Sequence, residues 1–229
     1  ILLGLVGSEM CIRDRLQTVL LTALLALSPV AVGETAPSAQ EVVSAVESTY
    51  KDVQSMEASF VQVTRAVGVE TRQQGEVKIK RPRKMRWDFT QPASSSFITD
   101  GQKLWVWSAA DNQVIVTEDL SGAASGNDMS QLLGDLSKLG ELFDVQTVEQ
   151  GTDATYTLQL TPKNATSFKS LQIEVTREGY TLQRVVVVDS FDAVAELDFS
   201  AVRMNSEIPD DQFTFVVPEG ATIIKTDGI

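Results

Sequence analysis

Hydrophobic and polar positions alternate with two different periods along the chain, and the first period is helical. Residues 41–54 place apolar side chains three or four positions apart, which is the spacing of an amphipathic helix. Ser38 and Glu41 have the separation of a capping box at the start of this segment. The predicted apolar stripe contains Val42, Ala45, Val46, Tyr50 and Val53. We expect one helix here, preceded by the polar leader 34–40.

A period of two follows this helix, as expected for strands that bury one face. The predicted strands are Phe60–Arg65, Gly75–Lys80, Met85–Thr90, Ser95–Thr99, Leu104–Ser108, Gln113–Thr117, Thr155–Leu160, Leu171–Thr176, Arg184–Asp189, Ala193–Ser200 and Gln212–Val217. Glycine, proline, asparagine and aspartate separate many of these segments and mark turns. Short, evenly spaced strands of this kind predict an antiparallel barrel or a strongly curved sheet.

The stretch between residues 121 and 143 interrupts the strands. Ser121–Asn127 is a loop of small residues, after which Asn127 or Asp128 could cap a helix that Gly134 and Gly140 weaken. One side of this helix would carry Leu132, Leu133, Leu136, Leu139 and Phe143. Two interpretations stay open, namely a movable lid over the sheet or a helix that permanently plugs one end of it.

The amino-terminal residues have the order of an export signal. Arg13 and Arg15 precede the apolar run Leu16–Leu27, and small residues ending at Gly33 follow. This order predicts a secretory signal peptide that is cleaved after Gly33. Residues 1–12 begin without methionine and carry a second apolar run, so we interpret them as a non-native extension of the reading frame. We therefore expect signal peptide and extension in residues 1–33, and one exported domain in residues 34–229.

The composition excludes several kinds of catalytic and metal-binding site. The chain contains no histidine, and its only cysteine, Cys11, lies in the segment expected to be removed. Catalytic triads with histidine, thiol nucleophiles, zinc sites with His or Cys ligands and iron–sulfur clusters are therefore excluded. The formal net charge of −12 disfavours contact with nucleic acid or an anionic membrane. We expect a binding protein that uses no cofactor or metal and is not an enzyme.

The most informative stretch runs from Gly75 to Pro92. If Val77 and Ile79 face the interior, Arg81 faces it as well, because side chains alternate across a strand. An arginine at the mouth of an apolar face needs acceptors, and its planar donors could hold backbone carbonyl groups at the end of a lid helix. The alternative is a strand-end arginine that reaches into water.

Apolar positions on the predicted strands and helix could leave an open cavity for hydrocarbon. The predicted cavity residues are Phe60, Ile79, Met85, Trp87, Phe89, Trp105, Trp107, Leu132, Leu133 and Leu136. Basic residues lie close to them in the sequence, and these are Lys80, Arg81, Arg83, Lys84 and Arg86. This positive cluster could dock an acidic partner, or it could be a solvated edge that deters strand pairing.

Several short motifs follow one another in order along the predicted strands. They are Ala58-Ser59-Phe60-Val61-Gln62; Gly75 before Lys80-Arg81-Pro82; Arg86-Trp87 before Thr90-Gln91-Pro92; Asp100-Gly101 before Leu104-Trp105; and Phe213-Thr214-Phe215 before Pro218 and Gly220. In this order they resemble the LolA family of periplasmic outer-membrane lipoprotein carriers. The resemblance covers nearly all of residues 34–229. It implies an incomplete, half-closed antiparallel β-barrel with an α-helical lid and a hydrophobic cavity for acyl chains.

The same resemblance implies partners and a role for one residue. A monomeric chaperone in the periplasm would receive lipoproteins from an inner-membrane ABC transporter of the LolCDE type and deliver them to a LolB-type outer-membrane receptor. Arg81 matches the family arginine that hydrogen-bonds the lid and favours closure, whereas Met85 stands where relatives carry an aromatic residue. LolB shares the architecture, but its anchor cysteine has no counterpart after the apolar run. An RseB-like lipoprotein-sensing regulator is the alternative, and it would need a second domain for its partner.

Overall fold

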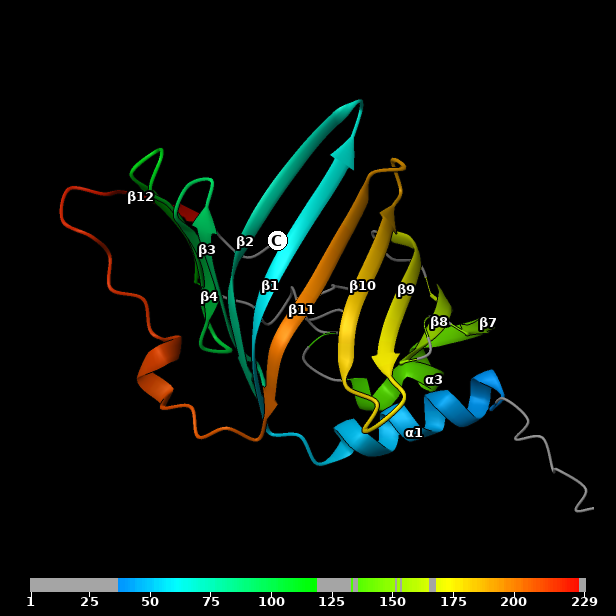
Figure 1. Cartoon of the computed structure of the whole chain (residues 1–229). Helices are drawn as coiled ribbons and strands as arrows, with labels where there is room; N and C mark the ends of the chain where they lie inside the picture. The colour runs from blue at the N-terminus through cyan, green and yellow to red at the C-terminus, as the bar shows by residue number, and fades with distance from the viewer. Residues whose placement is uncertain are drawn as a thin grey trace, which may run out of the picture. The chain divides into compact units, whose positions relative to one another are not determined.

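Within the described part of the chain, twelve strands form one sheet in the order β12-β6-β5-β4-β3-β2-β1-β11-β10-β9-β8-β7 (Figure 1). This part, in a computed structural model, comprises residues 37–118, 133, 136–150, 152, 154–164 and 168–226. The strands are β1 (Ser55–Ala66), β2 (Val69–Lys80), β3 (Lys84–Gln91), β4 (Ser95–Thr99), β5 (Leu104–Ser108), β6 (Gln113–Thr117), β7 (Phe143–Gln150), β8 (Thr155–Pro162), β9 (Phe168–Thr176), β10 (Leu182–Asp189), β11 (Val194–Met204) and β12 (Thr222–Thr226). Neighbours pair antiparallel except for β12 and β6, which run parallel. The sheet is open, which confirms the prediction of a mainly β protein with an incompletely closed sheet.

Helix α1 (Ala39–Lys51) precedes the sheet and confirms the predicted amphipathic helix. Its capping box is formed, because the Ser38 hydroxyl accepts a hydrogen bond from the Glu41 N–H and the Glu41 carboxylate accepts one from the Ser38 N–H. The helix buries Val42, Val43, Val46 and Tyr50. It ends at Lys51, three residues before the predicted end, as is common for the frayed last turn of a helix.

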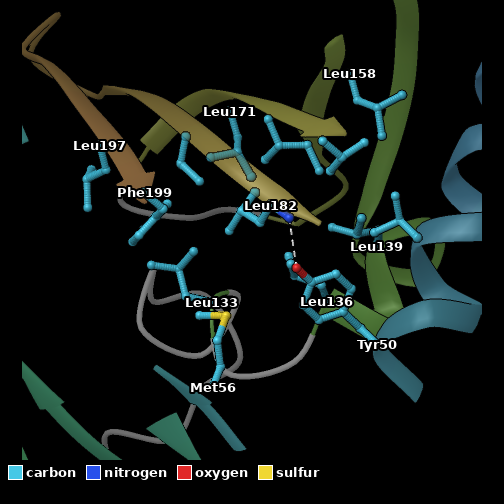
Figure 2. Packing of buried hydrophobic residues seen from close by; sticks show 14 of the residues in the cluster. Tyr50, Met56, Leu133, Leu136, Leu139, Leu158, Leu171, Leu182, Leu197 and Phe199 are labelled. Carbon is cyan, nitrogen blue, oxygen red and sulfur yellow. Dashed lines mark hydrogen bonds between the residues drawn. The ribbon is translucent and has the colours of Figure 1, made fainter. Parts of the chain in front are cut away.

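Side chains from both halves of the sheet meet α1 in one hydrophobic cluster on one side of the sheet, which we call the inner face. Residues paired across neighbouring strands point to the same side of the sheet. The pairs Phe60–Phe199 and Val77–Trp87 therefore bring side chains of β1, β2, β3 and β11 to the inner face. The other half of the sheet contributes Leu158, Leu171, Ile173, Leu182 and Val185, all buried. Figure 2 shows side chains of this half pointing toward Leu133, Leu136 and Leu139.

Part of the opposite side, the outer face, is covered by residues 205–221, which we call the C-terminal strap. Lys78 and Arg86 are paired neighbours on this face, and both donate hydrogen bonds to Gln212 of the strap. Phe213 of the strap is fully buried. Further buried apolar residues of the outer face are Ile98, Val114 and Val116, and the strap adds Ile208. The protein therefore has a second, smaller apolar layer behind the sheet.

Two strands were not predicted, and one predicted strand is wrong. The strap residues Gln212–Val217 form the end of a 3₁₀ helix, η2 (Asp210–Phe213), and an extended segment without a ladder. Their alternation arises because Phe213 is buried against the outer face, not because they pair in the sheet. The two consecutive isoleucines of β12 do not alternate with polar residues, so periodicity does not indicate this strand. Strand β7 is not predicted because the expected helix extends to Phe143, where the strand begins.

The predicted lid helix is described only in part. Leu133 is helical, and Leu136–Lys138 (η1) and Leu139–Leu142 (α3) form two short helical turns before β7. Leu133, Leu136 and Leu139 are buried in the inner-face cluster. Leu132 lies outside the described residues, as do residues 1–36 with the predicted signal peptide.

Candidate functional site

Four aromatic rings meet at the centre of the inner face. The ring of Phe60 on β1 lies 4.9 Å from the ring of Trp87 and 5.1 Å from that of Phe89, both in edge-on geometry. The ring of Phe199 on β11 lies 6.3 Å from Trp87. Gly75 on β2 is paired with Phe60 on one side and with Phe89 on the other. Because Gly75 has no side chain, the rings of its two neighbours meet across β2.

A row of apolar side chains crosses the inner face from β3 to the β12 edge, and we call it the apolar row. It consists of Trp87, Phe97, Val106, Ile115 and Ile224, which are direct neighbours on successive strands. Exposure rises along the row, from 8% at Trp87 to 37% at Val106, 38% at Ile115 and 41% at Ile224. The buried core therefore continues into an apolar strip that solvent can reach.

Short polar side chains flank the apolar row on both sides. One neighbouring row contains Ser95 and Ser108, and the other contains Thr99 and Thr117. The Thr117 hydroxyl shares a hydrogen bond of 2.9 Å with the Thr226 hydroxyl, so part of this polar border is satisfied internally. The strip carries no charge on its own residues, which makes it suited to hydrocarbon and not to a charged ligand.

The helical segments close the other end of the inner face. The Tyr50 hydroxyl of α1 accepts a hydrogen bond of 2.9 Å from the backbone N–H of Leu182, drawn as a dashed line in Figure 2. Burial raises the pKa of Tyr50 to about 12, an effect that the Leu182 N–H partly offsets. The Glu47 carboxylate of α1 accepts a hydrogen bond of 2.7 Å from the Gly140 N–H of α3. These contacts join α1 to both the sheet and the segment that follows the predicted lid.

Arg81, the predicted lid-closing residue, holds the C-terminal end of α1. Its guanidinium group donates hydrogen bonds of 3.0 Å to the Tyr50 carbonyl oxygen and 3.1 Å to the Lys51 carbonyl oxygen. The last carbonyl groups of a helix have no partner within the helix and carry its negative dipole end, so a cation is well matched to them. The acceptors are backbone carbonyl groups of the predicted kind and belong to α1, whereas most of the segment Asp128–Leu139 lies outside the described residues. The role of Arg81 in lid closure remains a prediction.

Most of the predicted cavity residues lie together on the inner face. Phe60, Ile79, Met85, Trp87, Leu133 and Leu136 are buried in its cluster, and Phe89 is half-buried against it. Sequence reasoning missed Phe97, Val106, Ile115 and Ile224 of the apolar row. Strands β5 and β6 are apolar on both faces, so periodicity could not indicate which residues point inward.

Trp105 and Trp107 do not belong to this site. Trp105 is paired with Ile98 and Trp107 with Ser96, and these residues alternate with the inner-facing Phe97. Both tryptophans therefore lie on the outer face, where the ring of Trp107 is 6.2 Å from that of Phe215 in the strap. The prediction that they line the same cavity as Trp87 is corrected by the register.

The basic cluster is largely engaged by the C-terminal strap. Lys80 and Lys84 form ion pairs of 2.6 Å and 2.7 Å with Asp210. Their hydrogen bonds lower the pKa of Asp210 to about 2. Arg86 forms an ion pair of 2.6 Å with Asp88. These contacts give the cluster a role in holding the strap against the sheet.

The described residues contain no group of three or more His, Cys, Asp or Glu side chains that could hold a metal ion. None of the helices described is long and apolar enough to cross a membrane.

Fold and site define an open β-sheet protein whose apolar inner face is closed at one end by a helix and accessible at the other. The family model described as "Outer membrane lipoprotein carrier protein LolA" matches residues 51–216. This match covers more than half of the 229 residues, so the chain belongs to the LolA family.

Relatives agree with this assignment, and a solved structure shares the fold. The chain is 28% identical over 208 residues to the outer-membrane lipoprotein carrier protein of Pseudomonas putida (strain W619), covering 90% of this chain and 97% of the relative. It is 30% identical over 205 residues to the protein of that name from Pseudomonas entomophila (strain L48), covering 88% and 97%. An uncharacterized conserved protein from Thermus thermophilus shares the fold, with a TM-score of 0.52, 14% identity, and coverage of 82% of this chain and 99% of its own.

Proposed function

We propose that this protein is a periplasmic carrier that binds the acyl chains of lipoproteins on its inner face, without catalysing a reaction. Lipoproteins would be received from an inner-membrane ABC transporter of the LolCDE type and delivered to a LolB-type receptor in the outer membrane. Family membership and the names of the relatives support a lipoprotein carrier. The observation that carries the proposal is the apolar row, which extends the core to an accessible edge of the sheet.

The dimensions of the apolar row fit a fatty acyl chain. It crosses five neighbouring strands, and four gaps of about 4.8 Å give a length of roughly 19 Å. One leaflet of a bilayer has a hydrocarbon depth of about 15 Å, so an extended acyl chain can lie along the row. Each methylene group buried there would stabilise the complex by about 0.8 kcal/mol, and ten of them by about 8 kcal/mol. Binding of this strength needs no polar contact with the cargo.

Arg81 and α1 supply a candidate for the closing element. The guanidinium group connects the end of β2 to the last turn of α1, while Glu47 connects α1 to Gly140. In this proposal the closed arrangement is favoured by Arg81, and cargo that occupies the inner face favours the open one. Release to a receptor then requires an acceptor surface that binds the acyl chains more strongly than the apolar row does.

A probe-displacement experiment tests the proposal. The protein should bind the fluorescent apolar probe N-phenyl-1-naphthylamine, and a triacylated lipoprotein should displace it. Ile115→Glu, which places a carboxylate in the apolar row, should weaken probe binding by about tenfold or more. Val216→Glu is the matched control, because Val216 is 83% exposed on the strap and lies outside the row. A probe that lipoprotein does not displace, or equal binding by both variants, would show the proposal to be wrong.

A pull-down from envelope extract separates the carrier from the RseB-like regulator. Capture of a transporter and an outer-membrane receptor supports transfer between membranes. Capture of a stress-signalling membrane protein in their place would favour the regulator and contradict the carrier.

A further inference from the structure

Two neighbouring hairpin tips expose apolar side chains at the end of the sheet opposite α1. Val67, in the loop between β1 and β2, is fully exposed, and Phe191, between β10 and β11, is 91% exposed. Figure 1 shows both hairpins projecting at the end of the sheet away from α1. The ladder between β1 and β11 ends at the pair Arg65–Val194, two residues from Val67 and three from Phe191. The Cα atoms of the two residues are therefore no more than about 23 Å apart.

Valine is unfavourable at position 67, both for its backbone conformation and for its exposed apolar side chain. The pair Ala66–Val69 closes a two-residue loop in which Val67 has φ +48° and Gly68 has φ +77°. Two-residue loops with positive φ at both positions favour Asn-Gly, and a β-branched residue in this region is strained. The fully exposed Val67 side chain has no packing that could compensate, so nothing in the folded chain explains a valine here.

Phe191 is presented by an ordered turn. The Asp189 carboxylate accepts hydrogen bonds from the Phe191 N–H at 2.7 Å and the Ala193 N–H at 2.8 Å. Asp192, in the same turn, forms an ion pair of 2.6 Å with Lys169 on β9. A turn held in this way keeps the phenylalanine ring in water, where it gains no burial energy within the protein.

The charges around the two tips nearly balance, whereas the whole chain is strongly acidic. Three basic residues lie there with four acidic ones, and these are Arg65, Arg72 and Lys169 with Glu70, Asp189, Asp192 and Glu196. The whole chain has a formal net charge of −12. Electrostatic repulsion from a membrane surface is therefore weaker at this end of the sheet than the net charge of the whole chain indicates.

We propose that Val67 and Phe191 form an apolar rim that inserts into the headgroup region of a lipid bilayer during brief encounters. Convex tips on two separate hairpins can enter a fluid interface without a complementary shape, whereas a protein partner would need two matching pockets. Apolar side chains at the headgroup level gain burial energy without a charged contact. Two side chains give a weak and reversible association, which suits a protein that must leave the surface again. The rim does not depend on the acyl-chain site, since neither residue belongs to the apolar row.

Vesicle flotation tests the rim. The exported protein, recovered from the periplasm of an expressing bacterium, is mixed with phosphatidylcholine vesicles and floated through a density gradient. The double variant Val67→Asn/Phe191→Ser should lower the partition coefficient by about tenfold or more, since both apolar contacts are lost. Val216→Ser is the matched control and should change partitioning by less than about twofold, because Val216 is also an exposed apolar residue but lies on the strap.

Folding and charge effects are separated by two further measurements. Asparagine suits the φ of Val67, so Val67→Asn should raise the urea midpoint or leave it unchanged while membrane partitioning falls. Adding phosphatidylglycerol should not strengthen binding, because the contact is apolar and the protein is acidic. Equal flotation of the wild type and the double variant, or no flotation of either, would overturn the proposal. A double variant that instead loses cross-links to an envelope protein would assign the rim to a protein partner. The assay contains no lipoprotein, so either result leaves the carrier proposal to its own test.

Discussion

Removal of the Arg81 guanidinium group tests whether the end of α1 is held by this residue. Arg81→Leu keeps the apolar stem of the side chain and removes the donors to the Tyr50 and Lys51 carbonyl oxygens. A hydrogen bond with a charged partner contributes about 1.5–3 kcal/mol in proteins. The site is partly exposed, so water can replace the lost donors, and we expect a total of about 2–3 kcal/mol for the two bonds.

This loss should appear as local opening of α1. A change of about 2–3 kcal/mol raises the population with α1 detached about 30- to 160-fold. Amide hydrogen exchange followed by mass spectrometry should show faster exchange in the second half of α1, while the central strands β1, β2 and β11 keep their protection. Access of an apolar probe to the inner face should rise in the same variant, because α1 covers one end of that face.

Arg203→Leu is the matched control for the loss of an arginine. Arg203 is 65% exposed on β11 and forms a surface ion pair with Glu57, which contributes about 1 kcal/mol or less. Exchange in α1 should not change in this control. If Arg81→Leu and Arg203→Leu gave the same exchange in α1, Arg81 would not hold the helix, and its proposed part in closure would be refuted.

Three other changes probe the packing around the site. Burial raises the pKa of Tyr50 to about 12, so the contribution of Tyr50 to stability should be constant below pH 10 and should fall by about 3 kcal/mol as the pH rises from 10 to 12. Urea unfolding of Tyr50→Phe should not show this alkaline loss, although the variant should be about 1–3 kcal/mol less stable at neutral pH because the Leu182 N–H loses its acceptor. Gly75→Ala would place a Cβ 1.9 Å from the Asp88 carbonyl oxygen and should lower the free energy of unfolding by at least about 2 kcal/mol in the same assay. Gly68→Ala meets open space and should lower it by about 1 kcal/mol because of the positive φ, so equal losses in the two variants would contradict the close approach of β2 and β3. Lys80 and Lys84 lower the pKa of Asp210 to about 2, so its contribution to stability is present above about pH 4 and is lost as the pH falls toward 2. Asp210→Asn should remove this part of the acid dependence, and an unchanged profile would mean that the ion pairs of Asp210 do not help to hold the strap.

The sequence by itself determined the elements whose signals are local. A capping box and an apolar stripe define α1 within a few residues, because both depend on neighbours along the chain. Three strand predictions, Ser95–Thr99, Leu104–Ser108 and Gln113–Thr117, match the observed bounds. The common face of Met85, Trp87 and Phe89 follows from alternation on a strand that is polar on its other side.

Only the tertiary structure decided which face of β5 and β6 points inward. Both strands are apolar on two faces, and the outer face is apolar because the C-terminal strap covers it. That cover comes from residues about 100 positions later in the chain, so no local pattern could place Trp105 and Trp107 outside and Val106 and Ile115 inside. The parallel pairing of β12 with β6 has the same origin. Contacts between distant segments therefore built the apolar row, while the helix and the central strands were already specified by their own residues.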